Sequence, residues 1–299
     1  MNPSADLLKD LVPMLAFFSF WLGAAIASFL NVVIWRVPRG ESIVSPPSHC
    51  PNCNAPIRWW QNVPILSWLA LRGKCANCRA PISPRYILVE LLGGLLFLAA
   101  FFKYFYDCSS EPELWLPMVV ALLIFWTWIS LMIVGSFIDF DHQLLPDFVT
   151  VGGMVLGVLG HLFLSVYSFF LCGWVCADGW WSVVSPLATS LFGLAFGFGL
   201  LWLVRWLGSK AFKREAMGMG DVFLMGAVGA LFGPVAVLMT LILSSVFGSV
   251  VGLAMVLLAK TRLGGFTAIP FGPYICMGCL VWMFWGPELV DWYVHLVTP

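Results

Sequence analysis

Charged residues are scarce in this chain of 299 residues: Asp, Glu, Lys and Arg make up 10% of it, and there are only four histidines. Soluble globular domains carry about 25% charged and about 45–50% apolar residues. Here 61% of the residues are hydrophobic and the mean hydropathy is +0.94. A compact soluble core cannot hide so much apolar surface, and the composition also excludes a disordered chain or a secreted disulfide scaffold. The sequence therefore predicts an integral membrane protein.

Other patterns are missing as well. We find no low-complexity tract and no internal repeat. No Gly-x-Gly-x-x-Gly follows a predicted strand, so a Rossmann-type fold is not expected. The 15 basic and 15 acidic residues cancel, so the net charge gives no sign of a nucleic-acid partner, and we expect none.

Apolar runs follow one another along most of the chain. A membrane-crossing helix needs about 20 apolar residues, and seven runs reach that length. The eighth, 221–233, is short, glycine-rich and closed by Gly233-Pro234; we predict a helix that crosses with support from its neighbours, and a half-helix is the alternative. The first run lacks a basic start and continues into Arg36, so we predict a retained helix rather than a signal peptide. The sequence predicts an all-α polytopic protein with spans at about 11–36, 86–106, 115–138, 148–171, 181–207, 221–233, 235–259 and 274–296.

Basic residues are unequally divided between the two sides of this topology. Thirteen of the 15 lysines and arginines fall in turns on one side, and only Lys9 and Lys103 fall on the other. Because cytoplasmic loops are enriched in Lys and Arg, we expect the basic side to be cytoplasmic and both termini to lie outside. The basic residues there are expected to hold membrane lipid headgroups. A seven-span topology would break this asymmetry after residue 221.

The only long polar stretch, 38–85, contains two Cys-x-x-Cys pairs. Cys50/Cys53 and Cys75/Cys78 are separated by 21 residues. Two such pairs can place four thiolates tetrahedrally around one zinc ion, and a reducing cytoplasm disfavours disulfides. Because sulfur fills all four positions, we expect a structural zinc that folds this loop. Four unrelated thiols are the alternative.

The remaining cysteines carry weaker signals. Cys276 and Cys279 also form a Cys-x-x-Cys pair, but they lie in an apolar run without a second pair. We interpret them as small residues of a membrane helix. Cys108, Cys172 and Cys176 fall near the predicted outer face, and the sequence does not decide whether they form a disulfide.

Aspartates at the cytoplasmic ends of predicted helices are the sharper signal for chemistry. Asp139 ends the third predicted span, and Asp221, the last residue of a Gly-Met-Gly-Asp motif, opens the sixth. Ionisable residues in or beside the bilayer are costly and indicate function. Two carboxyl groups that meet can share a proton, activate water and polarise a peptide carbonyl. The alternative is that such aspartates cap helices, as Asp147 would; two motifs on the same membrane face favour catalysis.

Several further motifs accompany these aspartates. They are GAAIASFLNVVIWRVP at 23–38, the two cysteine pairs, NVPILSWLALRGKC at 62–75, RYILVEL at 85–91, the segment 139–147, GMGD at 218–221 and IPFGP at 269–273. In this order the chain resembles the type IV prepilin peptidases, the GxGD-type aspartyl proteases of the bacterial inner membrane. One departure is Ala27, at a position where the family more often has glycine.

The resemblance implies that Asp139 and Asp221 are catalytic and cleave the short basic leader of prepilins or pseudopilins at the cytoplasmic membrane surface. Members with the cysteine loop also N-methylate the new terminal residue, usually Phe, with S-adenosylmethionine. The zinc loop and active site would then face the cytoplasm from the inner membrane. Asp141, His142 and Asp147 belong to the motif but not to the expected catalytic pair.

Three regions are expected: a first transmembrane helix at 1–37, a cytoplasmic zinc-binding and methyltransferase loop at 38–85, and aspartyl peptidase helices at 86–299. The sequence assigns no methyl-transfer residue; Glu90 is a candidate for recognising a free amine, with pairing to Arg85 or a neighbouring helix as the alternative. The rival functions are a proton-coupled transporter, a zinc scaffold without catalysis, and a peptidase that no longer methylates. A transporter would place its ionisable residues near the bilayer midplane, whereas these cluster at one face.

Overall fold

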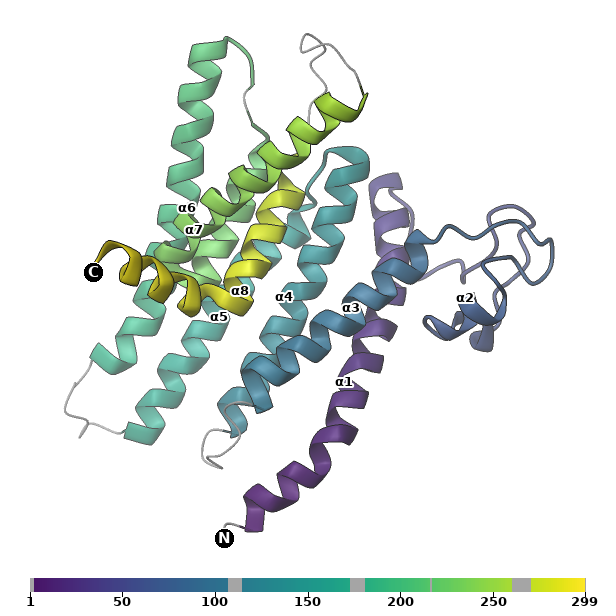
Figure 1. Ribbon diagram of the computed structural model, residues 1–299, viewed down its shortest axis with the longest axis horizontal. Helices are drawn as coiled ribbons and strands as arrows, with labels where there is room; N and C mark the ends of the chain where they lie inside the picture. The colour runs from purple at the N-terminus through teal and green to yellow at the C-terminus, as the bar shows by residue number, and fades with distance from the viewer. Residues whose placement is uncertain (1–2, 107–114, 173–180, 216, 260–269, 299) are drawn as a thin grey trace. The chain divides into compact units, whose positions relative to one another are not determined.

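The computed structural model describes residues 3–106, 115–172, 181–215, 217–259 and 270–298, and it is almost entirely helical (Figure 1). Within these ranges there is no sheet, only two isolated β-bridges in the cysteine loop. The chain forms two compact units, residues 1–134 and 135–299. The long helices are α1 (Pro3–Arg36), α3 (Arg85–Phe101), α4 (Trp115–His142), α5 (Asp147–Cys172), α6 (Trp181–Phe212), α7 (Met219–Ala259) and α8 (Gly272–Val297).

Six of the helices in the described ranges are long and apolar enough to cross a membrane, judged by length and composition. They are α1, α3, α4, α5, α6 and α7. In hydrocarbon every backbone amide must be satisfied internally, and a continuous apolar helix does this with its own i to i−4 ladder. The chain is therefore a multi-pass membrane protein.

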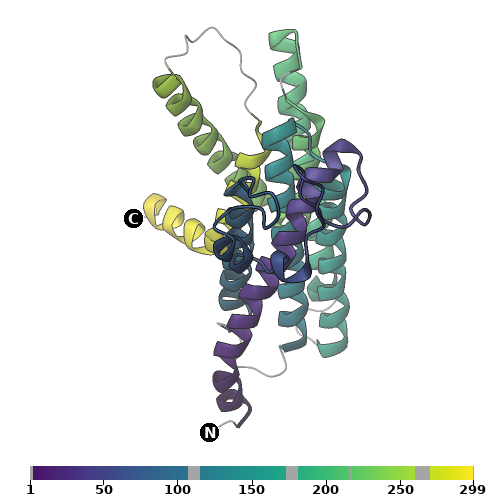
Figure 2. The same cartoon turned by 90° about the vertical axis from the view of Figure 1, so that its right-hand side faces the viewer.

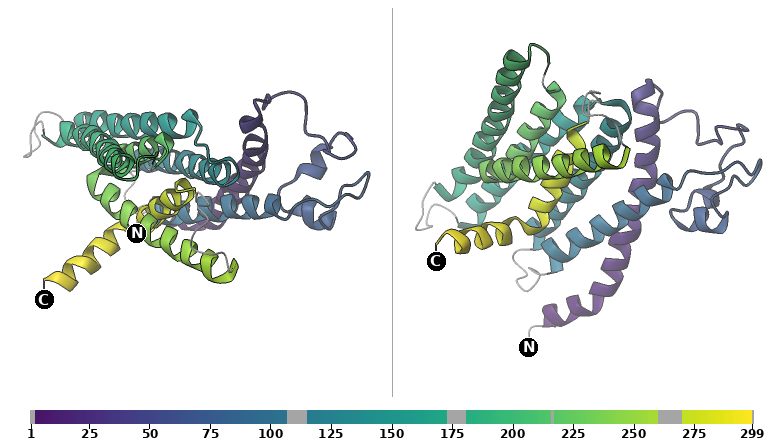
Figure 3. Two further views of the ribbon diagram at one scale, coloured as in Figure 1. Left: turned by 90° about the horizontal axis from the view of Figure 1, so that it is seen from above. Right: turned by 45° about the horizontal axis from the view of Figure 1, so that its top comes forward.

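A break inside α7 divides it into two helices. Gly233 has φ 82° and ψ −178°, a combination that only glycine adopts readily, and Pro234 supplies no amide to the helical ladder. The segment after the break leaves α5 and α6 at an angle (Figure 3). When α7 is counted as two helices, one on each side of Gly233, and α8 is included, the described ranges contain eight long helices. This confirms the expected count.

The helix α8 occupies the range predicted for the last span but is not straight. Its backbone leaves helical geometry at Trp285, two residues before Pro287. A proline ring clashes with the carbonyl four residues earlier and kinks the helix there. α8 is not among the six helices that meet the length and composition criterion.

Glycines let helix backbones touch within each unit. In the second unit, a Cβ placed on Gly193 of α6 would overlap the carbonyl oxygen of Gly229 on α7, and the reverse also holds. In the first unit, a Cβ on Gly93 of α3 would lie 2.5 Å from the Cβ of Ala27 on α1. Without a hydrophobic force between helices in lipid, such close packing is what holds them together.

The segment between α1 and α3 forms a small lobe to one side of these two helices in Figure 1, and this lobe faces the viewer in Figure 2. It contains the 3₁₀ turns η1 (Val37–Arg39) and η2 (Trp59–Asn62) and the short helix α2 (Leu66–Ala70). Buried Ile65, next to α2, packs with Ala24 of α1 and Ile87 of α3. This small apolar contact ties the lobe to the two helices that flank it.

Candidate active site and metal centre

Asp139 lies in the last turn of α4 and is buried. Its Oδ2 accepts a hydrogen bond of 3.1 Å from the backbone N–H of Gly272, the first residue of α8. The N-terminus of a helix carries unsatisfied amides and the positive end of the helix dipole. The start of α8 therefore holds this carboxylate in place.

Asp221 lies in the first turn of α7 and is also buried. The preceding Gly220 packs against Leu145: a Cβ on Gly220 would lie 2.8 Å from the Cβ of Leu145. The same leucine reaches Gly272, where an added Cβ would lie 3.2 Å from its Cδ1. Leu145 thus touches both the glycine beside Asp221 and the glycine that binds Asp139.

The two carboxyl groups lie close enough for their charges to interact. The thiol of buried Cys276, in the second turn of α8, lies within electrostatic reach of both and hydrogen-bonds the side chain of Ser136. Three helices, α4, α7 and α8, therefore contribute to one buried polar site. The sequence prediction of Asp139 and Asp221 did not include Gly272, Leu145 or Cys276, although the IPFGP motif that contains Gly272 was noted for the family resemblance.

The four sulfur atoms of Cys50, Cys53, Cys75 and Cys78 all lie within 4.8 Å of one another, so this group can hold a metal ion. The Sγ atoms of Cys50 and Cys78 are 3.8 Å apart. Four sulfurs placed about 2.3 Å from a tetrahedral centre would be separated by about 3.8 Å. The donor set therefore fits a tetrahedral ion. It is the only group of three or more potential ligands in the described ranges.

The two cysteine turns are structurally equivalent. In each, the first cysteine donates its N–H to an alanine carbonyl five residues on, at 3.0 Å to Ala55 and 2.9 Å to Ala80. An asparagine amide from each turn reaches a sulfur of the other at 3.5 Å, Asn52 to Cys78 and Asn77 to Cys53. The expectation of no internal repeat was therefore wrong at this scale. Residues 50, 52, 53, 55, 56 and 57 recur with the same identity 25 positions later.

The sulfurs differ in acidity. The hydrogen bond from the Asn52 amide, together with the backbone of Ala80, lowers the pKa of Cys78 to about 6. At Cys50, backbone hydrogen bonds from Asn52 and Cys53 favour the thiolate, but burial and the neighbouring thiols of Cys75 and Cys53 outweigh them and raise its pKa to about 11. Adjacent thiolates repel one another, and a divalent cation between them would remove that repulsion.

Glu90 of α3 is buried and faces the lobe rather than solvent. Its Oε2 accepts a 2.7 Å hydrogen bond from the N–H of Ile65, and it also hydrogen-bonds the Ser28 side chain. Ile65 has φ 62°, which is strained for a β-branched residue. Glu90 thus fixes a strained turn at the start of α2.

The other predicted site residues lie apart from these clusters. Asp141 and His142 at the end of α4 and Asp147 at the start of α5 are exposed. Cys276 and Cys279 are buried in α8, as expected for small residues of a membrane helix. The positions of Cys108 and Cys176 and the side chain of Cys172 lie outside the described residues.

Fold and site together define a class: a multi-pass membrane protein with a buried pair of aspartates at helix ends and a four-cysteine loop. Residues 21–104 match the bacterial peptidase A24 N-terminal domain, and residues 126–253 match the type IV leader peptidase family. The chain belongs to the type IV leader peptidase family.

Curated relatives cover nearly the whole chain. A prepilin leader peptidase/N-methyltransferase of Myxococcus xanthus is 39% identical over 96% of this chain and 77% of the relative. A protein of the same name from Stutzerimonas stutzeri is 34% identical over 98% of this chain and 96% of the relative. A type 4 prepilin-like proteins leader peptide-processing enzyme of Escherichia coli is 35% identical over 86% of this chain and 88% of the relative. No solved structure matches the chain.

Proposed function

We propose that this protein cleaves the leader peptide of type IV prepilins or pseudopilins and methylates the new amino terminus. One observation carries the peptidase half: Asp139 and Asp221, on different helices, are both buried and interact in a chain of the leader peptidase family. The names of its relatives support both activities. Incubating a purified prepilin with the protein and following leader loss by mass spectrometry tests the proposal.

Asp139 and Asp221 would act as one acid–base unit that shares a proton. One carboxylate takes a proton from water as the water oxygen attacks the scissile carbonyl carbon. The other carboxyl group, protonated, donates a hydrogen bond to the carbonyl oxygen. The carbon–nitrogen bond then breaks and the leaving nitrogen receives the proton. The attacking group is water, so no covalent enzyme intermediate forms. The proposed metal ion is held in the other compact unit and takes no part in this proposed step.

We infer that the four cysteines hold one structural zinc ion. All-sulfur tetrahedral sites are typical of structural zinc, and the observed sulfur separations suit this geometry. The proposed regions are then a first transmembrane helix at 1–37, a zinc-binding loop at 38–85 and peptidase helices at 86–299. The loop carries the proposed methyltransferase function.

The proposed methyl donor is S-adenosylmethionine, which supplies an electrophilic methyl group on a sulfonium. The lone pair of the new terminal amine forms the nitrogen–carbon bond, the carbon–sulfur bond breaks with its electron pair on sulfur, and the amine loses one proton. The protein has to bind the donor, orient the amine and accept or relay that proton. A peptidase without methylation remains the rival, and an assay with a methyl donor separates the two.

We further propose that the protein lies in the bacterial inner membrane with the loop and the aspartates facing the cytoplasm and both termini outside. The uneven distribution of lysine and arginine supports this orientation. A prepilin has a charged leader and an apolar segment in the bilayer, so its scissile bond lies at the membrane boundary. The aspartates, at helix ends, suit that position.

The substitution Gly272→Ala is expected to lower the cleavage rate roughly 10- to 100-fold, because small displacements of catalytic groups have effects of this size. The added Cβ would lie 2.6 Å from Oδ2 of Asp139 and would push the carboxylate away. Initial rates of prepilin cleavage measure the effect. Gly152→Ala on α5 is the matched control, since an added Cβ there meets nothing within 4 Å. A Gly272→Ala rate equal to that of the control would contradict the assigned position of Asp139.

A further inference from the structure

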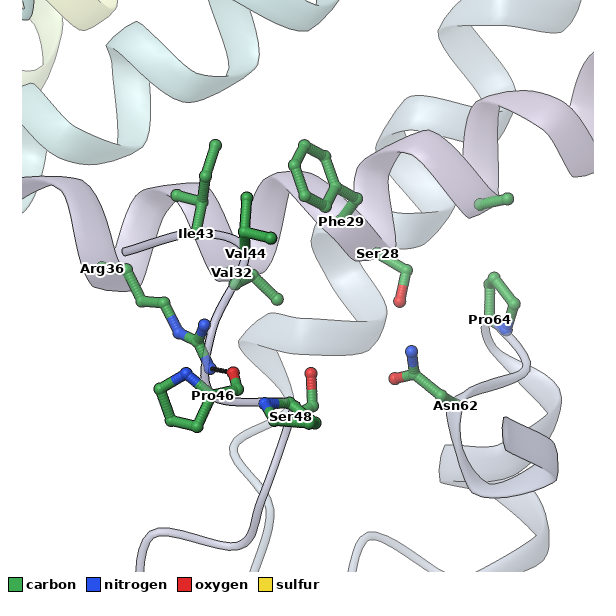
Figure 4. Close-up of a pocket in the computed structure, with 12 residues that line it drawn as sticks. Ser28, Phe29, Val32, Arg36, Ile43, Val44, Pro46, Ser48, Asn62 and Pro64 are labelled. Carbon is green, nitrogen blue, oxygen red and sulfur yellow. Dashed lines mark hydrogen bonds between the residues drawn. The ribbon is translucent and has the colours of Figure 1, made fainter. Parts of the chain in front are cut away.

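A cavity of about 360 Å³ lies between α1 and the lobe that follows it (Figure 4). Small-molecule sites in proteins range from about 300 to 1,000 Å³. One stripe of α1 forms one wall, with Ser28, Phe29, Val32 and Arg36. The other walls are formed by lobe residues: Ile43, Val44, Pro46, Pro47, Ser48, Asn62 and Pro64. All of these residues belong to the first compact unit, and none belongs to the aspartate site.

Arg36 places a buried positive charge at one end of this cavity, with only 7% of the residue exposed. Its two terminal nitrogens donate to the carbonyl oxygens of Ser42 at 2.9 Å and Pro46 at 2.8 Å. Within the described residues it has no acidic partner. A guanidinium carries five N–H donors, so three remain. A buried charge is normally paired, and a planar carboxylate is the group that best matches guanidinium.

The other end of the cavity carries neutral polar groups backed by the buried carboxyl group of Glu90. The hydroxyls of Ser28 and Ser48 and the amide of Asn62 point into the same space in Figure 4. Ser28 in turn hydrogen-bonds buried Glu90. Ser28 and Arg36 are separated by eight residues of α1, about 12 Å along the helix axis. The cavity therefore has a positive end, a polar end with an acid behind it, and apolar walls formed by Phe29, Val32 and five prolines or aliphatic residues of the lobe.

We propose that this cavity binds the methyl donor, a nucleoside sulfonium that carries an amino acid with a free carboxylate, with this carboxylate on Arg36 and its sulfonium and adenosine toward Ser28 and Asn62. The proposal rests on the methyl-transfer half of the proposed function. The guanidinium at one end suits a carboxylate, the polar groups with a carboxyl group behind them suit a cationic centre, and the apolar walls suit a flat purine. Glu90 acts here as a positioning residue: it holds Ser28 on one side and the backbone of Ile65 on the other.

The test measures binding, independently of turnover, with the full-length protein in detergent or nanodiscs. The probes are S-adenosylhomocysteine, which carries the amino-acid carboxylate, and 5′-methylthioadenosine, which lacks it. Arg36→Met is expected to weaken S-adenosylhomocysteine binding roughly 10- to 100-fold, the usual size of a lost charge-assisted hydrogen bond. Binding of 5′-methylthioadenosine should barely change. A purely structural role for Arg36 would weaken both probes alike.

Two further variants keep the proposal falsifiable. Arg39→Met removes the same charge one turn away, where the guanidinium is exposed and stacks 3.7 Å from the Trp35 ring; both probes should bind it as they bind the wild type. Ala25→Phe adds a ring into the cavity from an exposed position and should abolish binding of both probes. If Arg36→Met fails to fold, unchanged binding by Ala25→Phe overturns the proposal.

The outcomes separate the cavity from the function. If the wild type methylates its product and Arg36→Met binds S-adenosylhomocysteine like the wild type, the donor lies elsewhere and the cavity belongs to another anion, such as a lipid headgroup. If the wild type cleaves prepilin but neither binds the probe nor transfers methyl, the methyl-transfer function itself fails, and this proposal with it. Selective loss of the carboxylate-bearing probe in Arg36→Met supports it.

Discussion

Replacing Asp221 by asparagine is expected to lower the rate of prepilin cleavage by about 10³-fold or more, and Asp139→Asn should do the same. An amide of the same size cannot carry the proton that the two carboxyl groups share, and general acid–base catalysis contributes about 10²- to 10⁴-fold. Because the two groups are proposed to act as one unit, the double variant should be hardly slower than either single one. Initial cleavage rates of one prepilin, measured for all three variants at equal folded concentration, give the comparison.

The matched control is Asp147→Asn. Asp147 lies in the first turn of the neighbouring helix α5 but is exposed, whereas Asp139 and Asp221 are buried. It should retain a rate close to that of the wild type. If either Asp139→Asn or Asp221→Asn still cleaves at this rate, the catalytic assignment is wrong. If both variants do, a zinc scaffold without catalysis is favoured.

Replacing Cys78 by serine is expected to release the metal ion and unfold the loop at 38–85. A segment this small cannot bury enough apolar surface to fold by itself, and structural zinc supplies about 10–16 kcal/mol in comparable peptides. Metal content by mass spectrometry and limited digestion with trypsin are the measurements. The side chains of Arg58, Arg72 and Lys74 are exposed in the folded loop. The rate at which trypsin cleaves after them therefore reports how ordered the loop backbone is, and not whether trypsin can reach these side chains. Prepilin cleavage should fall much less, because both aspartates belong to the other compact unit.

His49→Ala is the control for the metal site. His49 lies beside Cys50 but is exposed, and its Nδ1 lies 3.1 Å from the carbonyl oxygen of Pro47. This variant should keep one zinc ion per chain and the trypsin resistance of the wild type. Retention of the ion by Cys78→Ser would mean that the four sulfurs do not act together.

Most of the helices could be predicted because membrane spans are long apolar runs. The break in α7 was visible as Gly233-Pro234, since only glycine takes that backbone geometry and proline ends the ladder. The kink at Trp285 in α8 is caused by Pro287, two residues later. Because the apolar run continues through this point, the sequence did not predict that the helix bends there. The short repeat of the cysteine turns was also present in the sequence. Its two copies are only eight residues long and have unrelated flanks, so they do not form a repeat of the whole chain.

The two aspartates of the proposed site were predicted from the sequence, and the structure buries both, but the groups that contact them were not predicted. Asp139 and Asp221 stand out because carboxyl groups beside a bilayer are costly. The amide that binds Asp139 belongs to Gly272, 133 residues away, and only the folded chain brings the two together. Arg36 was counted among the residues that set orientation; its burial against the carbonyls of Ser42 and Pro46 depends on the path of the loop.

The equivalence of the two cysteine turns has a consequence for the donor cavity. Pro47 and Ser48 precede the first turn, and Asn62 and Pro64 lie between the two turns, so the proposed ion would anchor both walls of the cavity that the lobe forms. Each turn offers two sulfurs, and neither alone completes a tetrahedral site. If the cysteines hold zinc and the cavity holds the methyl donor, as proposed, we expect the two occupancies to be thermodynamically linked. By reciprocity, a bound donor should tighten the hold on zinc by the same factor by which zinc tightens the hold on the donor.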